Sequence, residues 1–174
     1  MKTSKQWWES VKNNQSLLNQ WLMNQYHGEV KAAEKIEQLI LSKEAPESQK
    51  RIIRIIIEQE KKHAVWIGQL LITRGITPKV LEKKKRYWDK TLSQIVDWDT
   101  SCAVAAHAER MRLERIRVIC EDKDTPEDIR IVFEKILVEE EFHAATFDRF
   151  TTGDALLATS DKHEAGMKEL GLEI

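Results

Sequence analysis

Apolar residues recur every three or four positions in four long stretches of the chain, which is the pattern of helices with one buried face. We expect these helices over about 16–42, 46–74, 97–121 and 126–152. Pro46, Pro78 and Pro126 fall where the periodicity breaks, and Gly75 follows the second stretch, as is typical of a helix end. The isoleucine-rich residues 52–57 would suit a strand, but the length and period of the whole stretch favour a helix. The sequence therefore predicts an all-α fold.

Two of the predicted helices carry N-cap signals. Ser16 is a plausible N-cap for the first helix. The fourth has the clearest start, with Thr125 as N-cap, Pro126 at the first helical position and Asp128 at the third, and we expect it to end before Gly153.

The remaining segments are expected to complete one domain that spans all 174 residues. Residues 76–95 interrupt the helical pattern and are predicted to form a long crossover between the second and third helices. Residues 4–14 suit a short helix, and residues 154–174 suit a docked tail with a weak amphipathic pattern.

The second half of the chain repeats the first at a fixed offset, so that positions 24–70 align with positions 104–150 without a gap. Each copy holds a Glu-x-x-His pair and, at the same distance before the acid of that pair, a further glutamate. The repeated residues are Glu29, Glu60, His63, Glu109, Glu140 and His143. The Glu-x-x-His spacing places the acid and the histidine of each pair on one helix face.

The repeated glutamates are placed symmetrically about the predicted turns. Residues equidistant from the turn of an antiparallel helix pair lie at the same height, and Glu29 and Glu60 are equidistant from a point near residue 44. Glu109 and Glu140 have the same relation to a point near residue 124. Each hairpin therefore presents two carboxylates and one histidine at one level, about 23 Å from its turn.

Four carboxylates that share an apolar interior would repel one another and lose hydration, at a cost of several kcal/mol per ion. Cations would offset this cost, and two divalent ions bridged by carboxylates are the simplest arrangement. Oxygen and imidazole ligands suit iron or manganese better than thiolate-seeking metals. One glutamate from each of two helices and Glu-x-x-His from each of two others is the recurring pattern of di-metal carboxylate bundles.

This pattern resembles the rubrerythrin and ferritin-like superfamily over about residues 16–152. The resemblance implies a ferritin-like antiparallel four-helix bundle with one long crossover and short terminal helices. It also implies that the six repeated residues bind two iron ions, with manganese as the alternative. The ligand set is similar as well to those of manganese catalases and of di-iron tRNA hydroxylases.

Two features depart from rubrerythrins. Arg112 follows Glu109 at the position where rubrerythrins have a further glutamate, one helical turn on. Cys102 and Cys120 are the only cysteines, too few for the four-cysteine rubredoxin-like domain of that family. The chain thus resembles a rubrerythrin-like domain without the rubredoxin module.

The resemblance implies an oxidoreductase that acts on peroxide or O₂, as a peroxidase or a ferroxidase, and that takes electrons from an external donor. A di-iron substrate hydroxylase, a metal-binding or storage protein and a metal-free structural bundle remain as alternatives.

Two residues near the expected ligands each have more than one possible role. Tyr26 could hydrogen-bond a ligand, carry an electron or simply belong to the core, and Arg112 could pair with a ligand carboxylate or lie at a helix boundary.

Composition and charge limit the partners and the compartment that we expect for this protein. The formal net charge is −1, which gives no reason to expect a nucleic-acid partner, although the basic run at positions 83–86 could contact phosphates or serve as a solvated linker. No apolar run approaches the length that a membrane-spanning helix needs, so we expect no membrane span. Two unpaired cysteines suit a reducing cytoplasm. A homodimer is compatible with all of these features.

Overall fold

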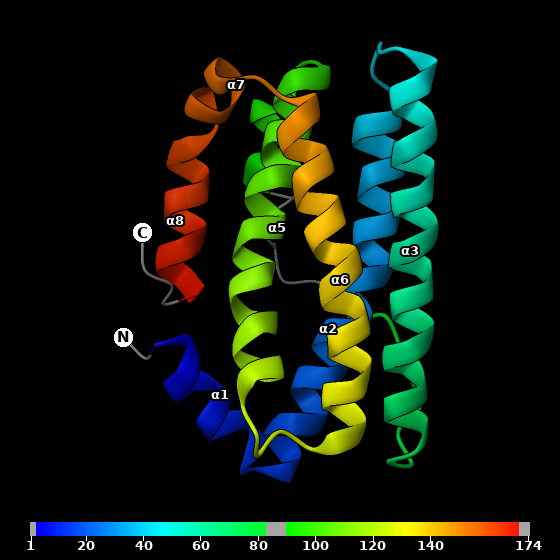
Figure 1. Ribbon diagram of the computed structural model, residues 1–174, viewed down its shortest axis with the longest axis vertical. Helices are drawn as coiled ribbons and strands as arrows, with labels where there is room; N and C mark the ends of the chain where they lie inside the picture. Colours follow the sequence, from blue (N-terminus) through cyan, green and yellow to red (C-terminus); the bar gives the residue numbers. More distant parts are fainter. Residues whose placement is uncertain (1–2, 83–89, 171–174) are drawn as a thin grey trace.

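The computed structural model describes residues 3–82 and 90–170, and every regular element within these ranges is helical (Figure 1). The elements in chain order are α1 (Ser4–Lys12), α2 (Gln15–Ile36), η1 (Glu37–Leu41), α3 (Glu47–Ile72), η2 (Leu92–Gln94), α5 (Trp98–Glu121), α6 (Glu127–Phe150), α7 (Gly153–Ala158) and α8 (Ser160–Leu170). The predicted all-α fold is confirmed. None of the described helices combines the length and apolarity that a membrane span needs.

The four long helices form two antiparallel hairpins, one made by α2 and α3 and the other by α5 and α6, and the hairpins pack side by side through α3 and α6 (Figure 1). Their connecting turns lie at opposite ends of the molecule. The end of α3 and the start of α5, which residues 76–95 connect in the sequence, therefore lie at opposite ends of the molecule. The basic run at 83–86 lies outside the described residues.

Two details of the first hairpin follow from local geometry. Asn14, not Ser16, caps α2, because its side chain accepts a hydrogen bond from the backbone N–H of Leu17 at 3.1 Å. The predicted single helix that ends near residue 42 instead finishes with the π-helical turn η1. Gly75 has a φ of 71°, the left-handed conformation that favours glycine after a helix.

The predicted cap of the fourth helix is wrong. Pro126 occupies the N-cap position of α6 and Thr125 precedes it. The Thr125 hydroxyl donates to the carbonyl of Ile119 at 2.8 Å and accepts from the indole N–H of Trp8 at 2.9 Å. The Thr125 hydroxyl thus links α1, α5 and the turn, and it makes no capping hydrogen bond to the backbone N–H groups at the start of α6.

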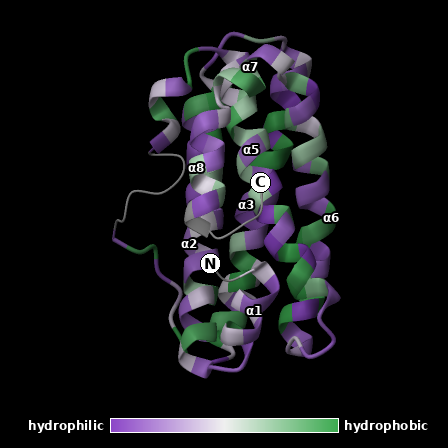
Figure 2. Cartoon of the chain, turned by 90° about the vertical axis from the view of Figure 1, so that its left-hand side faces the viewer, coloured by the Kyte–Doolittle hydropathy of each residue, from purple (hydrophilic) through white to green (hydrophobic). Residues whose placement is uncertain are grey.

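The apolar core is divided into two clusters by the level of the repeated acids. The first cluster lies toward the α5–α6 turn and includes Trp21, Leu71 and Phe133. The second lies toward the α2–α3 turn and includes Ile53 and Phe147. Hydrophobic and hydrophilic positions alternate along the helices in Figure 2, in keeping with amphipathic helices around a shared interior. On each long helix the repeated residues fall between the two clusters.

Shorter segments are attached to this frame through two histidines that the repeat places at equivalent positions. His27 accepts a hydrogen bond at Nδ1 from the backbone N–H of Leu81, which ties the start of the crossover to α2. His107 lies 3.1 Å from the Thr159 hydroxyl and stacks on His163 of α8, with ring centroids 4.2 Å apart. His107 therefore joins the C-terminal helices to the bundle.

Candidate metal centre

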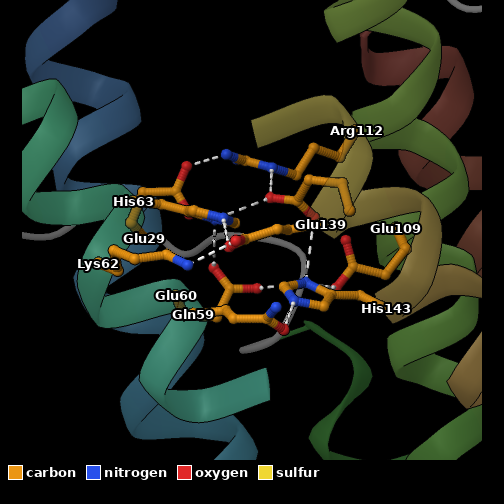
Figure 3. Close-up of polar contacts among 10 residues, drawn as sticks. Glu29, Gln59, Glu60, Lys62, His63, Glu109, Arg112, Glu139 and His143 are labelled. Atoms are coloured by element: carbon orange, nitrogen blue, oxygen red, sulfur yellow. Dashed lines mark hydrogen bonds and ion pairs between the residues drawn. The ribbon is translucent and has the colours of Figure 1, made fainter. Parts of the chain in front are cut away.

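The six repeated acids and histidines meet in the interior of the molecule, between the two apolar clusters. Figure 3 labels all of them except Glu140. Each is at most 6% exposed. α2 and α5 each contribute one glutamate, whereas α3 and α6 each contribute a glutamate and a histidine one turn apart. Because the residues of each hairpin are equidistant from its turn, the two hairpins bring all six to one level.

The donor atoms fall into two overlapping groups, within each of which they lie no more than 4.8 Å apart. The group that we name the Glu29 half-site consists of Glu29, Glu60, His63 and Glu140. The group that we name the Glu109 half-site consists of Glu60, Glu109, Glu140 and His143. The carboxylates of Glu60 and Glu140 belong to both groups, so they would be shared if each group held an ion.

His63 turns its Nδ1 atom toward the carboxylates of the Glu29 half-site. This nitrogen lies 3.4 Å from Glu140 Oε1 and 3.5 Å from Glu29 Oε2. The opposite ring nitrogen, Nε2, lies 2.9 Å from Glu139 Oε2. An outward nitrogen held by a carboxylate fixes the orientation of the ring, and it leaves Nδ1 as the atom that faces the centre.

His143 is oriented in the same way in the Glu109 half-site. Its Nδ1 lies 3.2 Å from Glu60 Oε1, 3.5 Å from Glu140 Oε2 and 3.9 Å from Glu109 Oε1. Its Nε2 lies 3.0 Å from the side-chain oxygen of Gln59, which can only accept a hydrogen bond. With the proton on Nε2, the neutral imidazole directs the lone pair of Nδ1 inward, as a metal ligand requires.

Gln59 and Glu139 were missed by the sequence reasoning. Each directly precedes the acid of a Glu-x-x-His pair, and the offset of the repeat relates them to one another. Each supports the histidine of the other hairpin, a contact across helices that spacing along one chain segment does not reveal. Their equivalent positions in the repeat were the one feature of the sequence that could have drawn attention to them. Lys62 adds a further partner, with its Nζ 2.5 Å from Glu139 Oε1.

Several inward atoms have no hydrogen-bond partner among the residues that the structure describes. These buried atoms are Glu29 Oε2, His63 Nδ1, Glu140 Oε2 and His143 Nδ1. Buried polar atoms are ordinarily satisfied, and four such atoms that face one interior space suggest a ligand that is not part of the polypeptide. Carboxylate oxygens and imidazole nitrogens are a donor set for iron or manganese. The residues therefore fit a metal ion in each half-site.

Arg112 pairs with two of the repeated carboxylates, which resolves the two alternatives for this residue. Its Nη2 atom contacts Glu29 and its Nε donates to Glu140 Oε1 at 2.6 Å (Figure 3). The repeat equivalent of Arg112 is Ala32, which has no such side chain. The guanidinium thus contacts carboxylates of the Glu29 half-site, and the first hairpin has no counterpart at the equivalent position.

The carboxyl groups have widely different proton affinities in the metal-free protein. Burial raises the pKa of Glu109 well above its usual range, and the negative charge of Glu140 adds to the rise. Burial and the same charge raise the pKa of Glu60. Burial would also raise the pKa of Glu140, but the charge of Arg112 and the interactions with both ligand histidines lower it well below its usual range. Glu140 therefore carries the firmest negative charge of the centre.

The histidines respond to this charge. Burial alone would lower the pKa of His143, but interactions with the carboxylates of Glu140 and Glu60 outweigh it and raise the pKa to about 9. The pKa of His63 is raised as well, because interactions with Glu140 and Glu60 exceed the effect of burial. At neutral pH the metal-free centre thus holds a proton on His143 that a bound metal ion would displace.

Tyr26 lies apart from the six residues. Its ring lies beside Gly68 on α3, where a Cβ atom would come within 3.4 Å of it. Both residues line a mainly apolar groove of about 560 Å³ along α2 and α3. No hydrogen bond or ion pair joins Tyr26 to the centre within the described part of the chain, and its position suits packing.

No protein-family model, no curated protein and no solved structure matches this chain. The case for a metal centre therefore depends on the donor atoms and their arrangement. The resemblance to rubrerythrins and ferritins, which the motif spacing suggested, stays a prediction.

Proposed function

We propose that the chain is a ferritin-like four-helix bundle that holds a di-iron, or alternatively di-manganese, carboxylate centre and acts as an oxidoreductase on peroxide or O₂. The observation that carries this proposal is the overlap of the two four-residue groups at Glu60 and Glu140. Two separate mononuclear sites would not need shared carboxylates. A pair of adjacent ions would, because bridging oxygens lower the repulsion between the ions.

Each residue then has a defined task. Glu60 and Glu140 would bridge, while Glu29 with His63 and Glu109 with His143 would complete the two half-sites. When bound, the paired ions supply electrons and Lewis acidity for the reduction of peroxide or O₂. Glu139 and Gln59 hold the imidazoles in place, and the apolar clusters above and below keep bulk water from the carboxylates.

Reduction of one peroxide to two waters consumes two electrons and two protons. The two cysteines are too few for an internal four-cysteine iron site, and Cys102 is fully buried, with a pKa raised by burial to about 12. Electrons must therefore come from a donor outside these 174 residues, unless peroxide disproportionates and serves as its own reductant. Protons must come from solvent or from groups at the centre.

A substrate hydroxylase is the second candidate, and the groove along α2 and α3 is the observation that favours it. Its volume of about 560 Å³ suits a small organic molecule. None of the six repeated residues is among its lining residues, however, so a molecule bound there would not contact the centre. Peroxide and O₂ need no such pocket, and for this reason we favour them as substrates.

Rapid mixing of the reduced, iron-loaded protein with peroxide or O₂ tests the proposal. We expect one fast oxidation, followed by arrest until a separate electron carrier or fresh ferrous iron is added. Sustained oxygen evolution from peroxide would instead indicate catalase-type disproportionation. Inertness of the reduced metals toward both oxidants would contradict the proposed activity and leave a storage role.

A further inference from the structure

The two half-sites differ in a way that the repeat does not predict. Arg112 belongs to α5, one turn after Glu109, yet its guanidinium reaches Glu29 and Glu140 rather than Glu109. Both contacted carboxylates are fully buried. Glu60 and Glu109 form no ion pair with a lysine or an arginine among the residues that the structure describes. Within those residues, Arg112 thus contacts Glu29, which belongs to one half-site alone, and the shared Glu140, but it does not contact Glu109.

A guanidinium and a metal ion compete for the same atoms here. Arg112 uses Oε1 of Glu140, and it uses Oε1 of Glu29. Oε2 of Glu29 stays free of the arginine, but Oε1 of Glu140 is the oxygen that lies 3.4 Å from His63 Nδ1. Charge-assisted hydrogen bonds to buried carboxylates are strong, so an ion that binds between His63 and Glu140 must first displace the arginine from this oxygen. The Glu109 half-site requires no such step, because His143 faces the other oxygen of Glu140, Oε2, which has no hydrogen-bond partner in the described part of the chain.

We propose that Arg112 is a built-in counter-cation of the Glu29 half-site and sets the order in which the two metal ions bind. The first ion binds at the Glu109 half-site, and the second binds more weakly at the Glu29 half-site after Arg112 releases Glu29 and Glu140. The Arg112 side chain is 21% exposed, so it has access to solvent when it leaves the carboxylates. This inference depends on the proposed di-metal centre and makes Arg112 a positioning residue.

Titration of the metal-free protein with Mn²⁺, followed by electron paramagnetic resonance, separates the two steps. The signal of free Mn²⁺ measures the unbound ion, and the amount bound is the difference from the amount added. The spin-coupled signal of a pair appears only in chains that hold two ions. For the wild type we expect the coupled signal only after one ion per chain is bound, with the second affinity at least about tenfold weaker, which corresponds to about 1.4 kcal/mol.

Variants assign the steps. Arg112→Ala should tighten the second step by about tenfold or more, so that the coupled signal appears from the start of the titration. Arg112→Lys keeps a charge but cannot reach two carboxylates with a planar fork, so it should give an intermediate separation. Arg117→Ala is the matched control, since Arg117 lies on the same helix and pairs with Glu141 at a surface where both side chains are 51% exposed. It should match the wild type.

Ligand variants locate the first ion. Glu109→Gln should abolish the tight first step, whereas Glu29→Gln should leave it intact and remove the coupled signal. Circular dichroism tests whether each variant is folded. If Arg112→Ala does not fold, Arg112→Lys and the two ligand variants test the order of binding.

Equal separation of the steps in the wild type and in a folded Arg112→Ala or Arg112→Lys protein would overturn the role of Arg112 but leave the metal centre standing. A tight first step that disappears in Glu29→Gln and survives in Glu109→Gln would do the same. Failure of the wild type and of every variant to bind any ion would instead contradict the centre itself.

Discussion

The Glu29 half-site and the Glu109 half-site come from one repeated pattern, but their surroundings differ in charge. His63 is supported by the carboxylate of Glu139, and Lys62 and Arg112 lie close to the same half-site. His143 is supported by the neutral amide of Gln59. The positions of the candidate ligands are thus shared between the halves, while the groups that contact those residues are not.

This comparison shows where the repeat carries information and where it does not. One constant offset relates every ligand of one half to a ligand of the other. The same offset relates Glu139 to Gln59 and Arg112 to Ala32, and these pairs differ in charge. We infer that both halves retain the capacity to bind an ion and that the substitutions make the two ions unequal.

The largest expected effect on metal affinity comes from removing a carboxylate that both half-sites share, compared with one that belongs to a single half-site. Glu60→Ala removes a donor from both half-sites, so we expect the affinity for both ions to fall by more than about 100-fold. Glu29→Ala should weaken only the second ion. Isothermal titration with Fe²⁺ under anaerobic conditions measures both, and equal losses in the two variants would remove the distinction between shared and terminal ligands.

The next effect is the dependence of stability on pH. In the metal-free protein the pKa of His143 is raised from 6.5 to about 9, so the protonated imidazole stabilises the fold fully below pH 6.5, and this contribution is lost as the pH rises through about 9. The raised pKa of Glu109 acts in the same direction. We expect the free energy of unfolding to fall by about 3 kcal/mol between pH 6.5 and 9.5.

Metal-loaded protein should show the opposite trend over the same range, since the ligand histidines must lose their protons before they bind. Denaturant titrations of both forms at several pH values test this pair of expectations. His143→Gln, which removes the titrating imidazole, should flatten the metal-free profile. Parallel profiles for the loaded and metal-free forms would speak against a buried, protonated cluster.

A smaller effect is expected from making the histidine supports alike. Glu139→Gln gives His63 the same amide partner that His143 already has, and loss of the anionic partner should reduce affinity at the Glu29 half-site by about tenfold. The converse change, Gln59→Glu, should strengthen binding at the Glu109 half-site. Competition titrations with a chelator report each affinity, and an unaltered Glu29 half-site in Glu139→Gln would mean that Glu139 does not act through His63.

The smallest effect should follow from Lys62→Met. Lys62 is partly exposed and, among the residues that the structure describes, is linked to the centre through Glu139 alone, so we expect a change of less than about 1 kcal/mol in stability. Metal affinity should change by less than about threefold. Thermal unfolding and the same chelator competition measure the two quantities. A loss as large as that in Glu139→Gln would show that Lys62 and Glu139 act as one unit.

Much of this arrangement could be predicted because it depends on spacing. Helical periodicity located the long helices, and equal distances from the turns brought Glu29 level with Glu60 and Glu109 level with Glu140. What escaped prediction depends on competition between side chains in space. Thr125 had two better partners than its own helix.

The contacts of long side chains could not be predicted for the same reason. The direction in which Arg112 extends, and the pairing of Gln59 and Glu139 with histidines of the opposite hairpin, depend on how the two hairpins pack against each other. No pattern within a single helix contains that information. Their positions in the repeat were visible in the sequence, but their partners were not.

The central claim, that one chain holds two metal ions between its hairpins, is tested most directly by elemental analysis of protein purified from iron- and manganese-replete cells. We expect close to two ions per chain in the wild type, and a clear loss in Glu60→Ala and in Glu140→Ala, since each of these residues belongs to both half-sites. Wild-type protein without metal, or an unchanged metal content in both variants, would contradict the account.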